Sequence, residues 1–226
     1  MKKRLEKIIR FEEMWLFIWI ILWAIYLFIE SETKTNPQGH LLTSAYFLLS
    51  SALIIFIFKD YLKFVIPKKM SIVPFLAVLL SIAFSFVIYY HLTINFQMPQ
   101  ELSFLTESTI KDHFSLQGNF IINTFFEILF QQTLIILLTG FFTIRMKLSM
   151  KKTLFYFLIV FGTLHLIGLS VSGIYGSIFL IASIFASLIF PYLISRIEYG
   201  FVYSYIIHFL FHTLIGPLLW IYFILF

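Results

Sequence analysis

Residues 118–144 read GNFIINTFFEILFQQTLIILLTGFFTI, and this stretch decides the fold class. A helix needs roughly 20 predominantly apolar residues to cross a bilayer, so the stretch is long enough to do so. The hydrocarbon core has no water to pair with backbone groups, so a crossing segment of this kind must be helical. Further apolar segments of similar character lie at about 13–30, 41–58, 71–90, 152–171, 174–190 and 200–226. We therefore predict an all-α fold, a polytopic transmembrane bundle of about seven spanning helices.

The overall composition agrees with this class. Hydrophobic residues make up 61% of the 226 residues and charged residues only 12%, whereas soluble domains carry roughly 25% charged residues. The length fits one transmembrane helical domain over residues 1–226. Cysteine is absent, which excludes disulfides, thiolate metal sites and a cysteine nucleophile.

The positive charges predict the orientation of the bundle. Lys and Arg are retained on the cytoplasmic side during insertion, and all but Lys34 and Lys111 fall in the N-terminal tail or in the second, fourth and sixth connections. This places the N-terminus in the cytoplasm and the C-terminus outside, in a membrane that we predict to be the prokaryotic cytoplasmic membrane. An even number of spans remains an alternative, since the sixth segment lies between breaks at Gly173 and Pro191. The net charge is +5, but the charged residues lie between the apolar segments and do not form one patch. The expected partner is therefore the bilayer and not nucleic acid.

Ionisable residues inside the spans are the candidates for function, because each is unfavourable in lipid. Glu127 is the only acidic residue deep in a span, and His165, His208 and His212 are the histidines within spans. A rise of about 1.5 Å per residue places Glu127 and His212 roughly 12 Å, and His165 roughly 9 Å, below the outer surface. His208 lies about one turn deeper, on the same helix face as His212. We predict that these four residues share a site; pairing that only holds the bundle together is the alternative.

Three amide side chains surround Glu127 in the sequence. Gln131 and Gln132 lie about one turn below it and are predicted to form interhelical hydrogen bonds. Asn123, one turn above it, is compatible with either role.

Three short motifs carry a family resemblance: FEILFQQ at 126–132, FGTLH at 161–165 and HFLFH at 208–212. In order and spacing they resemble the EExxxR, FxxxH and HxxxN motifs of the CAAX-protease and bacteriocin-processing (CPBP, or Abi) family of intramembrane glutamic proteases. The resemblance covers about residues 118–215, the motif-bearing core. The chain departs from the family pattern at Phe126, Gln131 and His212, where the family has Glu, Arg and Asn.

The resemblance implies an intramembrane hydrolase that cleaves a peptide bond of a membrane-associated peptide or protein. Glu127 and His165 would activate a water, while His208 and His212 would stabilise the oxyanion. No cofactor is expected under this interpretation.

Two alternatives stay open. Glu127 with His165, His208 and His212 is also a ligand set that suits Zn or Fe, which would make the protein a metal-dependent membrane enzyme. Loss of the first family glutamate at Phe126 instead favours a non-catalytic scaffold or immunity protein.

Overall fold

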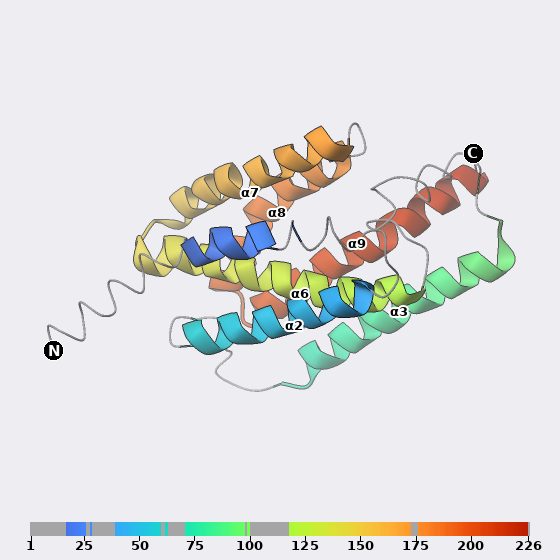
Figure 1. Ribbon diagram of the computed structural model, residues 1–226, viewed down its shortest axis with the longest axis horizontal. Helices are drawn as coiled ribbons and strands as arrows, with labels where there is room; N and C mark the ends of the chain where they lie inside the picture. The colour runs from blue at the N-terminus through green and yellow to red at the C-terminus, as the bar shows by residue number, and fades with distance from the viewer. Residues whose placement is uncertain are drawn as a thin grey trace, which may run out of the picture.

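The structure, a computed structural model, describes residues 17–25, 28, 39–59, 62, 71–97, 99, 118–172 and 176–225. Within these residues there are helices and no strands, which confirms the all-α prediction. Residues 17–25 are helical. The elements that follow are α2 (Gly39–Phe58), α3 (Val73–Asn95), α6 (Gly118–Gly140), the π-helix η3 (Phe141–Arg145), α7 (Met150–Ser172), α8 (Gly176–Arg196) and α9 (Gly200–Leu225). Figure 1 shows them as one elongated bundle.

Four of the described helical segments are long and apolar enough to cross a membrane. They are Val73–Asn95, Ile121–Arg145, Ser177–Arg196 and Gly200–Leu225. Helix α7 coincides with the expected span at 152–171, and the shorter apolar segment Leu42–Phe58 coincides with the one at 41–58. Part of the expected first span, including residues 13–16, lies outside the described residues, so the total of about seven stays a prediction. The length and composition of these helices support a membrane protein.

Two helices extend beyond the approximate spans expected from the sequence. Helix α3 continues to Asn95, and α8 continues through Pro191 to Arg196. Proline removes one backbone donor and often ends a helix in water. In a spanning helix the freed carbonyl is accommodated by neighbouring groups, because ending the helix within lipid would leave several backbone groups unpaired. Pro217 lies inside α9 in the same way.

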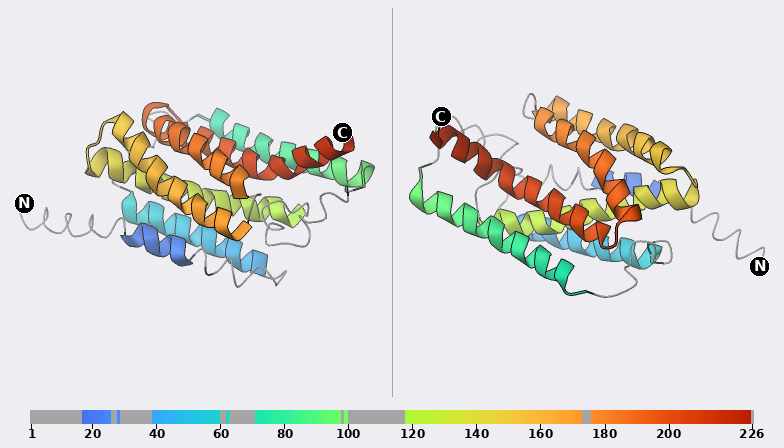
Figure 2. Two further views of the ribbon diagram at one scale, coloured as in Figure 1. Left: turned by 90° about the horizontal axis from the view of Figure 1, so that it is seen from above. Right: turned by 180° about the vertical axis from the view of Figure 1, so that it is seen from behind.

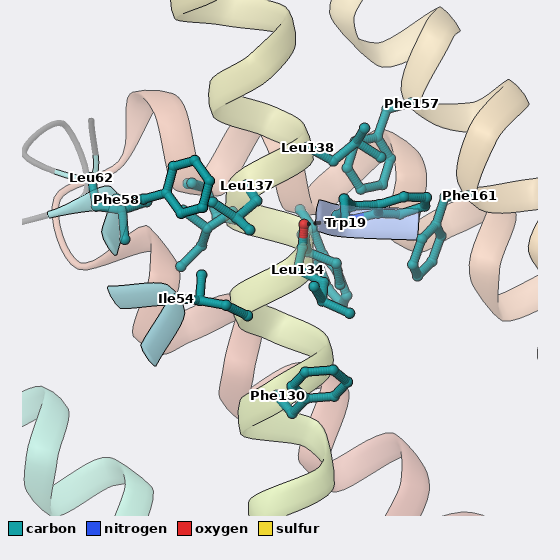
Figure 3. Packing of buried hydrophobic residues seen from close by; sticks show 14 of the residues in the cluster. Trp19, Ile54, Phe58, Leu62, Phe130, Leu134, Leu137, Leu138, Phe157 and Phe161 are labelled. Atoms are coloured by element: carbon teal, nitrogen blue, oxygen red, sulfur yellow. Dashed lines mark hydrogen bonds between the residues drawn. The ribbon is translucent and has the colours of Figure 1, made fainter. Parts of the chain in front are cut away.

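Helix α6 is the central element of the bundle. Residues 130–140 are all buried, and α6 contacts α2, α3, α7, α8 and α9. The burial of this stretch therefore comes from the helices packed around it and not from lipid. In Figure 3, Ile54, Phe58 and Leu62 lie on one side of α6, and Trp19, Phe157 and Phe161 lie on the other. The Trp19 indole also donates a hydrogen bond to the Leu134 carbonyl, at 3.1 Å.

A tight turn joins α8 to α9 and so positions the histidines of α9. Tyr199 adopts the left-handed conformation, with φ of 59°, and the Ile197 amide donates to the Leu193 carbonyl at 3.0 Å. Gly200 begins α9 against the end of α8. A Cβ at this position would lie 1.8 Å from the Leu193 carbonyl oxygen. Only glycine fits here without displacing the backbone of one helix.

The close approach predicts that Gly200→Ala destabilises the protein by about 1–3 kcal/mol, the usual effect of overpacking. Gly162→Ala in α7 is a matched control, because its added Cβ would meet only the Leu158 Cδ1 at 3.8 Å. Alanine is also favoured over glycine within a helix by up to about 1 kcal/mol. Thermal unfolding in detergent should therefore separate the two variants. Equal unfolding temperatures for both would contradict the packing described at Gly200.

Candidate functional site

A pocket lies between α7, α8 and α9, with a volume of about 450 Å³. Its lining is mostly phenylalanine, isoleucine and alanine, and its polar side chains are His165, Ser183, His208 and His212. The three histidines that the sequence singled out therefore gather in one place. Two come from α9 and one from α7.

His165 is held by its own helix. Its Nδ1 lies 2.8 Å from the carbonyl oxygen of Phe161, one turn earlier in α7. The imidazole ring also packs on the Phe161 ring, with centroids 4.6 Å apart. A carbonyl oxygen can only accept a hydrogen bond, so Nδ1 carries the proton, and Nε2 of the neutral ring carries the lone pair. The spacing FxxxH thus fixes both the orientation and the tautomer of His165.

His208 is fixed by contacts to α6 and α8. It is only 8% exposed, and its Nδ1 lies 3.4 Å from Gln132 Oε1. The Nε2 of Gln132 donates to Ser204 Oγ on α9, so the amide oxygen is the group that faces His208. This pairing again leaves the proton on Nδ1 and the lone pair on Nε2. The interhelical role predicted for Gln132 is confirmed.

His212 lies one helical turn beyond His208, and the two rings are 5.1 Å apart. The same-face arrangement predicted from their spacing is therefore present. The His212 ring also packs beside Phe179 of α8, with centroids 5.6 Å apart. The His208 ring packs against the Phe190 ring of α8, with centroids 5.5 Å apart.

Glu127 is placed differently from the histidines. It is partly buried on α6, where its Oε1 accepts a hydrogen bond from Gln131 Nε2 at 2.9 Å, and it is not part of the pocket lining. Glu127 is five positions from Gln132, which corresponds to about 140° around a helix. The side of α6 that carries Glu127 is therefore not the side that contacts His208. Gln131 bonds within its own helix and does not form the predicted bond to another helix in the described contacts.

Asn123 shows which neighbour the Glu127 side of α6 meets. Asn123, Glu127 and Gln131 are spaced by four residues and so share one helix face. The Ser44 hydroxyl of α2 donates to Asn123 Oδ1 at 2.7 Å. Asn123 thus links α6 to α2, which is one of the two roles considered for it.

The predicted metal-ligand set does not assemble in this arrangement. Among the described residues, which include all four candidates, no three His, Asp or Glu side chains are grouped closely enough to hold a metal ion.

Sequence reasoning missed several residues of the pocket, above all those of α8. Ser183 lines the pocket, and its hydroxyl donates to the Leu180 carbonyl at 2.7 Å. Ser187, one turn later, donates in turn to the Ser183 carbonyl at 2.6 Å. Two serines spaced by four residues inside an apolar span were a visible signal of an inward face. They were overlooked because only ionisable and amide side chains were considered.

The fold and the pocket define a helical membrane protein with a histidine-lined site. Comparison with protein-family models, with curated proteins and with solved structures found no match. The resemblance to the CPBP family therefore rests on the three motifs.

Proposed function

We propose that the protein is an intramembrane peptidase similar to the CPBP family, which hydrolyses a peptide bond of a membrane-associated peptide or protein. The observation that carries the proposal is the meeting of His165, His208 and His212 at one pocket. These residues come from the second and third motifs, which lie on α7 and α9 and are separated in the sequence by the whole of α8. Their common position supports a shared chemical role.

The tautomers support a different catalytic role for each histidine. The Nε2 of His165 accepts a proton from a water molecule, and the oxygen of that water attacks the carbonyl carbon of the substrate. An N–H of His212 donates to the oxyanion that forms. The proton on His165 then passes to the leaving amine as the carbon–nitrogen bond breaks. His208, held by Gln132, lies beside His212, and the contact between the two rings positions the His212 imidazole.

Glu127 has no direct step in this scheme, because it does not line the pocket. In the family a glutamate is expected to activate the water, so Glu127 is the residue that separates the two mechanisms. A neutral imidazole can replace a carboxylate in this role, since its Nε2 lone pair accepts a proton.

The scheme predicts that His165→Gln lowers peptide cleavage by at least about 100-fold, the usual contribution of a general base. Glu127→Gln should retain cleavage. His91→Gln is a matched control, because His91 is exposed near the end of α3 and bonds to Asn95. The assay uses purified protein in proteoliposomes with a library of apolar membrane peptides, and mass spectrometry identifies the fragments. Full activity of His165→Gln would refute the scheme, while selective loss in Glu127→Gln would indicate a glutamate-based mechanism.

A non-catalytic scaffold or immunity protein is the second candidate. It is favoured by the absence of any carboxylate among the described residues that line the pocket. Under this alternative the wild-type protein cleaves no peptide, and a partner protein depends on the bundle but not on His165. Normal partner levels in cells that carry His165→Gln, together with loss of the partner on deletion of the whole chain, would support it.

We also propose that the protein lies in a prokaryotic cytoplasmic membrane with its N-terminus inside and its C-terminus outside. The described Lys and Arg residues support this orientation, because they lie at the end of α2, at the α6–α7 junction and at the α8–α9 turn: Lys59, Arg145, Lys147, Lys151, Lys152 and Arg196. In Figures 1 and 2 these points lie toward one end of the bundle, and the ends of α3 and α9 lie toward the other. Cytoplasmic retention of cations accounts for such a distribution.

Orientation can be tested with single cysteines, because the natural chain has none. Gln97→Cys, just after α3, should react with a membrane-impermeant maleimide in intact cells. Lys151→Cys, at the start of α7, should react only after the membrane is permeabilised. Both positions are exposed. The reverse pattern would overturn the proposed orientation.

A further inference from the structure

The rim of the histidine pocket lies on the outer surface of the bundle. Ile181, Phe185 and Ile189 of α8 and Ile207 of α9 line the pocket, yet each is between 43% and 60% exposed. The surface of a spanning bundle at this level faces hydrocarbon. The pocket therefore opens sideways, between α8 and α9, toward lipid tails.

The interior of the pocket has the size and chemistry of a site for a hydrocarbon chain. Its volume of about 450 Å³ falls within the range of about 300–1,000 Å³ typical of ligand pockets. On α8, Ala182 and Ala186 are one turn apart and leave open space between larger neighbours. Phe161 and Phe190 form apolar walls. Such a lining favours methylene groups over polar ones.

The polar side chains of the pocket indicate which kind of ligand group could bind beside them. The Nδ1 atoms of His165 and His208 are engaged by Phe161 and Gln132, so their Nε2 atoms present lone pairs and accept hydrogen bonds. No Lys, Arg, Asp or Glu is among the described residues of the lining. A charged head group would therefore lose its hydration without gaining an opposite charge. A neutral group with an O–H or N–H fits this end of the pocket.

We propose that the pocket takes up a single-chain membrane amphiphile with a neutral, hydrogen-bond-donating head. Its chain enters from the bilayer between α8 and α9, and its head donates to the imidazole Nε2 atoms of His165 and His208. This inference goes beyond the proposed function, because it names a ligand of the same pocket that is not a peptide. It concerns binding and does not require hydrolysis.

The test uses a long-chain alcohol that carries a photoreactive diazirine near the end of its chain. The probe is added to the purified protein in proteoliposomes, irradiated, and located by mass spectrometry of peptides. Labelling should be saturable and concentrated on α8 and α9, and an excess of the unlabelled alcohol should compete with it. Ala186→Trp fills the pocket and should lower labelling by about tenfold or more. Ala52→Trp, on the exposed face of α2, is the control and should label as the wild type does.

The head group is tested with probes of the same chain length that end in a carboxylate or a quaternary ammonium. Both should label several-fold less than the alcohol, and His208→Phe should reduce that preference. Labelling that is not saturable in the wild-type protein would overturn the proposal, even if Ala186→Trp fails to fold. Equal labelling by the three probes would also overturn it. Saturable binding without peptide cleavage would support this inference and refute the peptidase proposal. Peptide cleavage without saturable binding would support the peptidase proposal and refute this inference.

Discussion

Other helices surround α6, and the lipid of the membrane surrounds the bundle that these helices form. Residues 130–140 are buried on every side, so no polar side chain on this stretch can turn to water. A hydrogen bond within the same helix or to a neighbouring helix replaces the missing water, although the Thr139 hydroxyl has no hydrogen-bond partner among the described residues. Thr133 takes the first solution and donates to the Leu129 carbonyl at 2.7 Å. Gln132 takes the second and reaches Ser204 and His208 of α9.

This constraint separates the polar groups of α6 into two systems. The Gln132 side meets α9 and fixes a histidine of the pocket, while the side with Asn123, Glu127 and Gln131 contacts α2 at Ser44. The histidine pocket then offers imidazole chemistry inside an apolar enclosure. Proton transfer by a neutral histidine and binding of a neutral head group use the same feature, a lone pair on Nε2. The two proposals therefore use the same lone pairs but differ in the ligand, which is a peptide in one and a single-chain amphiphile in the other.

The sequence predicts the helices well because apolar runs of spanning length have few alternatives in a membrane. It also predicts the grouping of His208 with His212, since a spacing of four residues fixes a common face. The sequence does not predict which neighbouring helix Glu127 faces. The depth of Glu127 in the membrane follows from counting residues, whereas the direction of its side chain depends on which helices pack against each side of α6. The continuation of α8 through Pro191 escaped prediction for a related reason, since neighbouring helices decide whether a proline ends a span.

The grouping of the three histidines at a pocket whose lining does not include Glu127 is tested most directly by crosslinking in the cysteine-free chain. Two double variants are compared in membranes: His165→Cys with His208→Cys, and Glu127→Cys with His208→Cys. A short bifunctional thiol reagent that fits within the pocket should join the first pair, because both positions line the same space. It should leave the second pair unlinked. Efficient crosslinking of the Glu127 pair, or none of the His165 pair, would contradict this arrangement of the site.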